Sequence, residues 1–161
     1  MKKLLICLVL LSLFLSSCAG GKKYRDDLST EALMTEILSA IPVEQGYGDM
    51  PETHFLYYFE DEMLPWDRTV QQSILAENIN EVGIFHTETA AEQSELREEL
   101  EDYLEDLREE KSAFVESYAP TEVPKLTAAC VRSFGSYTVY TVLDPKDQSL
   151  VWQAVERALA R

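Results

Sequence analysis

Basic residues are scarce in this sequence. It holds 14 lysines and arginines against 29 aspartates and glutamates, which gives a formal net charge of −15 at pH 7. From Leu28 onward, 9 basic residues stand against 27 acidic ones, a net charge of −18. Nucleic acids and anionic surfaces repel such a domain. The composition therefore predicts no nucleic-acid partner.

Long apolar runs are also lacking. The longest nearly apolar stretch covers residues 4–15 and is followed by Ser16 and Ser17. A membrane-spanning helix needs roughly 17–25 apolar residues. The stretch follows a short cationic start, Lys2 and Lys3, and precedes small residues. This arrangement is typical of a secretory signal peptide, which we place at residues 1–17 and expect to be helical.

The signal ends in Leu15, Ser16, Ser17 and Cys18. An apolar residue and two small residues before a cysteine resemble the lipobox of bacterial lipoproteins. The resemblance implies that Cys18 receives a diacylglyceryl group and becomes the mature N-terminus. Because two acyl chains give stable membrane residence, we expect a lipid-anchored protein on the extracytoplasmic face of the cell membrane.

Cysteines available for disulfides are absent from the expected mature chain. Cys7 leaves with the signal, Cys18 is lipidated, and Cys130 is the only thiol that remains. Stability must come from the core, which 144 residues can supply as one domain. We expect a flexible tether at residues 18–27 and a single domain at residues 28–161.

Helical periodicity predicts three helices in this domain. The first begins after Ser29 or Thr30 and ends at Pro42. The longest covers residues 89–118 and is strongly acidic, and the last begins at Asp144. One apolar stripe is expected to bury the long helix against the domain, with a coiled coil as the alternative. Its members are Leu96, Leu100, Tyr103, Leu107, Phe114 and Tyr118.

Four strands are predicted around these helices. Residues 54–59 and 81–87 are apolar and bounded by breakers, while residues 66–78 allow a short helix. Residues 126–143 are typical of a β-hairpin with Gly135 and Ser136 as a two-residue type II′ turn. The order of elements predicts an α+β fold, with a four-stranded, largely antiparallel sheet and helices packed on one face.

Several of these features occur together: the lipobox, the stretch from Asn80 to Phe85 before a charged helix, Tyr118-Ala119-Pro120 after it, and the segment around Gly135-Ser136. Together they resemble small lipoproteins of Gram-positive anaerobes that are classed as a domain of unknown function. The resemblance covers residues 31–144. It implies a compact α+β domain on a lipid anchor, and it implies no catalytic or binding residue.

Recognisable catalytic motifs are lacking. Histidine occurs only at His54 and His86, and neither they nor Cys130 have the spacing of a zinc site. A distant pairing of His86 with Cys130 stays open, although an inert buried cysteine is the favoured interpretation. Nucleophile motifs and phosphate-binding loops are also missing from the sequence. We therefore predict no enzyme, no cofactor and no metal site.

Two features allow binding. The acidic helix is either a solvated face or a docking surface for a basic protein. Aromatic residues near the first predicted strand are either core residues or a ligand surface. If a ligand surface exists, it is expected at Tyr47, Trp66, Glu60, Asp61 and Glu62, where the backbone is most irregular. The leading hypothesis is an accessory domain that docks a protein or envelope component, and the alternative is a small-ligand or cation-binding lipoprotein.

Overall fold

The structure is a computed structural model, and it describes residues 23–42, 46–53, 57, 66–75 and 78–161. The expected signal-peptide helix, Cys18 and the first half of the expected tether lie outside the described residues. So do Glu60, Asp61 and Glu62, and, apart from Tyr57, the strand predicted at residues 54–59. The described chain has an α+β fold.

Five strands form one antiparallel sheet in the order β1-β2-β3-β5-β4. Their bounds are β1 Tyr47–Asp49, β2 Asp67–Ser73, β3 Glu81–His86, β4 Cys130–Phe134 and β5 Tyr137–Val142. The expectation of four strands is therefore wrong. The strand predicted at residues 81–87 is confirmed as β3, and the predicted hairpin is confirmed as β4 and β5.

Strand β2 occupies the region where the sequence allows a short helix. Trp66, Val70 and Ile74 are spaced four residues apart, and this spacing fits a helical period of 3.6 as well as a strand period of 2. In the structure Trp66 and Val70 contact the same core cluster, while Thr69 between them bonds to Thr30 on the other face. The spacing of these residues fits both a helix and a strand, and pairing of this segment with β1 and β3 stabilises the strand.

The described helices of more than one turn are α2 Thr30–Leu38, α4 Ala90–Tyr118, α5 Val123–Ala128 and α6 Pro145–Ala158, and a 3₁₀ turn, η2, covers Pro120–Glu122. The three predicted helices are confirmed as α2, α4 and α6. Ser29 caps α2 and Asp144 caps α6 with side-chain oxygens, and Thr89 with Glu92 forms a full capping box before α4. The predicted hairpin began too early, because Leu126 belongs to α5.

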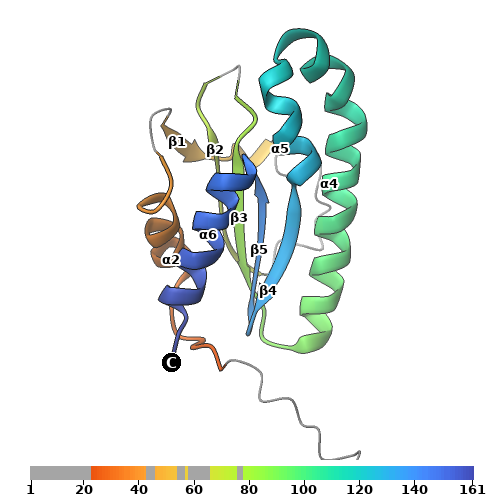
Figure 1. The fold of residues 1–161 in the computed structure, drawn as a ribbon. Coiled ribbons are helices and arrows are strands. Elements are labelled where there is room, and N and C mark those ends of the chain that lie inside the picture. Colours follow the sequence, from red (N-terminus) through yellow and green to blue (C-terminus); the bar gives the residue numbers. More distant parts are fainter. Residues whose placement is uncertain (1–22, 43–45, 54–56, 58–65, 76–77) are drawn as a thin grey trace, which may run out of the picture.

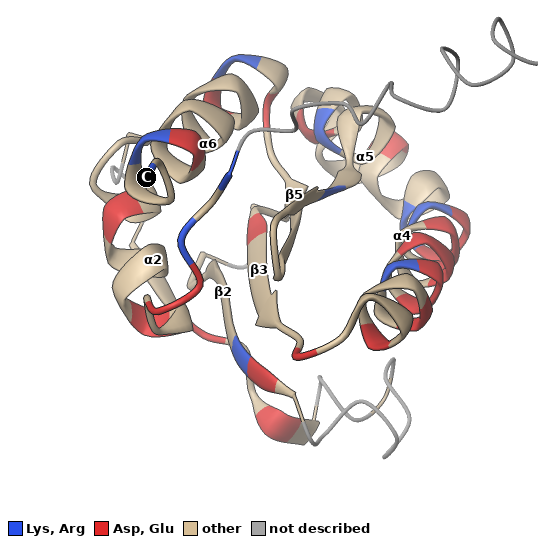
Figure 2. Ribbon diagram, turned by 90° about the horizontal axis from the view of Figure 1, so that it is seen from below, with Lys and Arg blue, Asp and Glu red and all other residues tan. Residues whose placement is uncertain are grey.

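Helices cover both faces of the sheet, and the expectation of one covered face is wrong (Figure 1). Helices α2 and α6 pack on one face, and α4 and α5 pack on the other, as the view along the strands also shows (Figure 2). The two central strands are consequently buried on both sides: all six residues of β5 are buried, and five of six in β3. Such doubly covered strands carry apolar residues almost continuously instead of in alternation.

The register of the β4–β5 hairpin is the one predicted. Phe134 pairs with Tyr137 and Cys130 pairs with Thr141 across the turn. Gly135 has a φ of +63°, and Ser136 is not among the residues with positive φ, as a type II′ turn requires. A two-residue turn leaves only one pairing for the strands that it joins, so the sequence determines the register.

The apolar stripe of α4 is buried only along its first part. Leu96, Leu100, Tyr103 and Leu107 lie in the core with Leu104 and Val115, whereas Phe114 is 57% exposed and Tyr118 is 78% exposed. Beyond the sheet, α4 packs against η2 and α5 instead, and these approach a different side of the helix. Because the stripe packs within its own domain, the structure favours core packing over a coiled coil.

Candidate functional site

An open groove of about 500 Å³ lies beside the first half of β2. Strand β1 pairs only with residues 71–73 of β2. The groove lies beside the preceding part of β2, up to Val70. We call this the edge groove. Its described lining residues are Glu31, Asp49, Met50, Glu52, Trp66, Asp67, Arg68, Thr69 and Val70.

Three of the four carboxylates that line the edge groove are held by neighbouring side chains. Three polar contacts fix them: Arg68 Nη2 donates to Glu52 Oε1 at 3.1 Å, Thr30 Oγ1 donates to Asp67 Oδ1 at 3.3 Å, and Gln71 Nε2 donates to Asp49 Oδ1. Each carboxylate accepts several hydrogen bonds when ionised. These contacts therefore orient the oxygens and leave acceptor capacity for a ligand.

The groove is suited to a cation. Among the described lining residues, Glu31, Asp49, Glu52 and Asp67 carry carboxylates, and Arg68 is the one that carries a positive charge. The indole of Trp66, which is partly exposed, lies in the same lining and provides a π-face for an ammonium or guanidinium group. An aromatic surface among net negative charge can bind the side chain of a lysine or arginine.

The ligand surface expected from the sequence is only partly assembled. Trp66 lies in the edge groove and packs with the α4 side of the core. Tyr47 packs with the α2 and α6 side instead, where its hydroxyl accepts a hydrogen bond from Asn80 Nδ2 at 3.0 Å. Within the described residues, the structure therefore does not bring Tyr47 and Trp66 together. Glu31 and Asp49 were missed, because nothing in the sequence shows that α2 and the end of β1 meet beside β2.

The pairing of His86 with Cys130 does not occur. His86 pairs with Tyr137 near the hairpin turn, whereas Cys130 pairs with Thr141 at the far end of the same strand. His86 packs against the Tyr137 ring at a centroid distance of 4.8 Å. Burial raises the pKa of the Cys130 thiol, which disfavours the reactive thiolate.

A buried carboxyl group lies between the sheet and α4. Glu81 is 7% exposed, and its Oε2 accepts hydrogen bonds from Tyr103 Oη at 2.6 Å and from Tyr140 Oη at 3.3 Å. Burial raises the pKa of Glu81 from 4.5 to about 7, because desolvation of the charged form outweighs the two hydrogen bonds. Burial and the charge of Glu81 likewise raise the pKa of Tyr140 well above its ordinary value.

Gly83 makes room for this cluster. It lies directly opposite Tyr140 in the sheet, and a Cβ atom at position 83 would lie 2.0 Å from Tyr140 Cε1. The fully buried Tyr140 ring therefore fills the space that a side chain on β3 would take. Glu81, Tyr103 and Tyr140 line none of the grooves found among the described residues. We therefore assign these three residues to the core.

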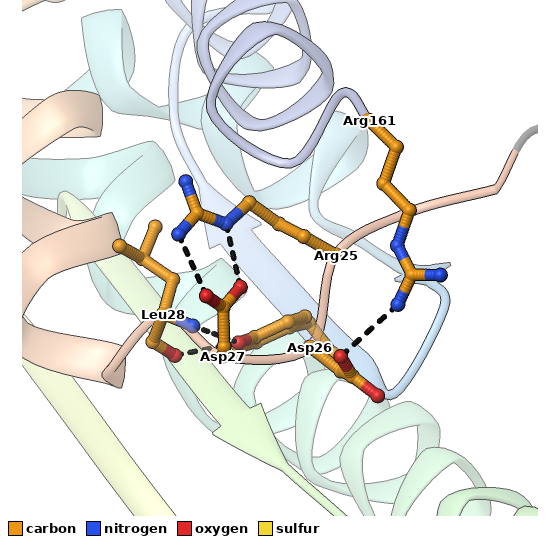
Figure 3. Close-up of polar contacts among 6 residues, drawn as sticks. Arg25, Asp26, Asp27, Leu28 and Arg161 are labelled. Atoms are coloured by element: carbon orange, nitrogen blue, oxygen red, sulfur yellow. Dashed lines mark hydrogen bonds and ion pairs between the residues drawn. The ribbon is translucent and has the colours of Figure 1, made fainter.

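The beginning of the described chain is fastened to the domain (Figure 3). Tyr24 forms a bridge with Ala160, and Arg25 N donates to Leu159 O at 2.9 Å. Leu28 N donates to Tyr137 Oη at 3.0 Å, and the same hydroxyl donates to Leu28 O at 2.5 Å. Residues 24–27 of the expected tether are thus held against the domain by Tyr24, Arg25 and the neighbouring Leu28.

Two ion pairs accompany these backbone contacts. Arg25 Nε and Nη2 donate to the two carboxylate oxygens of Asp27 at 2.7 and 2.9 Å, and Arg161 Nη2 donates to Asp26 at 3.2 Å. The guanidinium of Arg25 lowers the pKa of Asp27. Because both pairs are exposed to solvent, they orient the segment more than they stabilise it.

Within the described residues, no three histidine, cysteine, aspartate or glutamate side chains gather as metal ligands do. No described helix combines the length and the apolar character that crossing a membrane requires. No protein-family model, no curated protein and no solved structure matches the chain.

Proposed function

We propose that the protein is a lipid-anchored extracytoplasmic accessory domain that docks a protein or envelope component close to the membrane. The observation that carries this proposal is the edge groove, where Trp66 lies among four carboxylates. The groove fits a lysine-rich or arginine-rich segment of the partner, whose cations would contact the carboxylates and the indole.

The anchor is supported by the N-terminal sequence. Leu15, Ser16 and Ser17 precede Cys18 at the end of an apolar run, and a diacylglyceryl group on that thiol would hold the domain at the membrane. The Cys18→Ala variant is expected to lose lipid labelling and mature processing in cells. Normal lipid labelling of this variant would contradict the anchor.

A second candidate function is binding of a small cationic ligand or a metal cation. The volume of about 500 Å³ lies within the range of small-molecule sites, so the size of the groove suits a small ligand as well as a segment of a partner protein. A dedicated calcium site needs six to eight converging oxygens, and no three of the described carboxylates gather as metal ligands do. The edge groove therefore favours a partner with several cations spread along a segment.

Cross-linking in intact cells, followed by mass spectrometry of the cross-linked peptides, tests the docking. Glu31 and Glu36 are both exposed on α2, but only Glu31 lines the groove. Glu31→Lys should abolish cross-links between groove residues and the partner, and Glu36→Lys should preserve them. Both variants carry the same charge change on one helix, so a general effect of charge would reduce both equally.

The outcomes separate the two functions. Cross-links from the groove to a basic segment of one protein support docking. Cross-links that survive Glu31→Lys contradict the role of the groove. If no groove cross-links form, and spermidine or calcium raises the melting temperature of the wild-type protein but not that of Glu31→Lys, the small-ligand function replaces docking.

A further inference from the structure

We propose that the face around the C-terminal end of α6 docks on the anionic phospholipid headgroups of the membrane that holds the anchor. This inference rests on the proposed lipid anchor and adds an orientation to it. The face comprises Lys23, Tyr24, Gln153, Glu156, Arg157, Ala160 and Arg161, which line an open groove of about 610 Å³. We call it the anchor face.

The length of chain before this face limits its distance from the membrane. Because Tyr24, Arg25 and Leu28 bond to the domain, only the five steps from Cys18 to Lys23 separate the lipidated residue from the anchor face. Five residues span at most about 18 Å in any conformation. Lys23, the first residue of the anchor face, therefore stays within about 18 Å of the lipidated residue, or about two Debye lengths at physiological salt.

The charges at this face suit phosphate groups. Arg25 and Arg161 are paired with Asp27 and Asp26. Within the described residues, no ion pair involves the exposed side chains of Lys23 and Arg157. They can therefore contact lipid phosphates without first giving up a protein partner. Glu156 is the acidic residue that lines the groove with them.

The rest of the molecule has the opposite charge. The segment from Lys23 to Leu28 and the end of α6 from Glu156 to Arg161 together hold four basic and three acidic residues, while the other described residues hold seven basic and 21 acidic ones. The acidic surface of α4 lies across the sheet from α6 (Figure 2). An anionic membrane attracts the first region and repels the second. The domain is thereby oriented with α6 toward the lipid and α4 away from it.

Lysine acetylation of the lipidated protein in vesicles tests this orientation. Lys23 lies at the anchor face, and Lys146 lies at the opposite end of α6, and both are exposed. When phosphatidylglycerol is added to phosphatidylcholine vesicles, the acetylation rate of Lys23, read by mass spectrometry, should fall about fivefold. The rate at Lys146 should not change. Raising the salt to about 1 M should restore the rate at Lys23.

Two charge-reversal variants on α6 provide the matched comparison. Arg157→Glu should abolish the protection of Lys23 by phosphatidylglycerol, whereas Lys146→Glu should leave that protection intact. Equal rates at Lys23 in both kinds of vesicle, or equal protection of Lys23 and Lys146, would overturn the docking. Protein that does not float with neutral vesicles contradicts the lipid anchor itself, and with it the short link on which the docking depends.

Discussion

The two faces of the sheet are built differently. Under α2 and α6 the core is nearly all apolar, with Leu33, Ile37, Val82, Val139 and Val155 fully buried. Under α4 the sheet buries a carboxyl group, Glu81, bonded to two tyrosines. The stability of the second face therefore also depends on the protonation of one group.

The solvent-facing surfaces of the helices on the two sides of the sheet also differ. The α2 and α6 side binds the segment at Tyr24–Leu28 and presents the anchor face. Helix α4 from Ala90 to Tyr118 holds 11 acidic residues and three basic ones, and most of them are exposed. The structure thus places its strongest negative surface opposite the side from which the chain leads to the proposed anchor.

Gly83→Ala should give the largest effect, because its Cβ would lie 2.0 Å from the buried Tyr140 ring. Overpacking and the displaced Tyr140 hydroxyl together should cost about 4 kcal/mol in the free energy of unfolding. Urea denaturation measures this change. Gly48→Ala is the control, because its Cβ would meet only the exposed Ile74 side chain at 3.0 Å. Equal destabilisation by both substitutions would contradict the special role of Gly83.

Glu81 should make the stability of the α4 face depend on pH. Its pKa in the folded state is about 7, above the ordinary 4.5, so between these values the folded protein keeps a proton that the unfolded chain releases. The stabilisation is therefore fully present below pH 4.5 and is lost as the pH rises through 7. The loss amounts to about 3 kcal/mol.

The Glu81→Gln variant separates this effect from general charge repulsion. The introduced amide stays neutral at every pH, and its oxygen still accepts hydrogen bonds from Tyr103 and Tyr140. Denaturation between about pH 4.5 and 8 should therefore show a flatter profile and a variant that is more stable than the wild type at the upper end. Parallel pH profiles for the wild type and Glu81→Gln would show that Glu81 does not titrate in this range.

Tyr137→Phe tests the attachment of the chain to the apolar face. The substitution removes the hydroxyl that bonds to both backbone groups of Leu28 and should cost about 1–2 kcal/mol. Hydrogen exchange of the Leu28 amide should become faster, while the amides of β3 should keep their protection. Unchanged exchange at Leu28 would contradict the attachment.

Arg161→Ala should have the smallest effect. Its ion pair with Asp26 joins side chains that are 53% and 65% exposed, and such pairs contribute between 0 and about 1 kcal/mol. We expect a change in stability within about 0.5 kcal/mol by urea denaturation. A larger loss would mean that this ion pair, and not Tyr137, holds the segment.

The sequence predicted the elements that local chemistry determines. Capping residues defined the starts of α2 and α6, periodicity defined α4, and the turn at Gly135 fixed the hairpin register. The sequence did not predict helices on both faces. An amphipathic pattern shows which side of a helix is buried, but it does not show which face of the sheet that helix covers. The sequence of β5, Tyr-Thr-Val-Tyr-Thr-Val without a charged residue, carried that information, since a strand with one solvated face alternates between apolar and polar residues.

The candidate site was less accessible to prediction. Trp66 was identified, but its neighbours Glu31 and Asp49 come from two other elements, and their meeting depends on the tertiary arrangement. Tyr47 packs with the α2 and α6 side of the core, and the sequence could not show this because an aromatic residue near a loop fits a core as well as a site. The exposure of Phe114 was missed because periodicity does not show where a helix extends past the sheet.

The most direct test of the edge groove is the fluorescence of Trp66. Trp152 is the only other tryptophan, so the Trp152→Phe variant, after circular dichroism confirms its fold, reports on the groove alone. Titration with an oligo-arginine peptide should change the Trp66 emission in a saturable, salt-sensitive manner, and Glu31→Lys in the same background should weaken binding while Glu36→Lys should not. Emission that does not respond to the peptide, or that responds equally in both charge variants, would contradict the groove as the docking site.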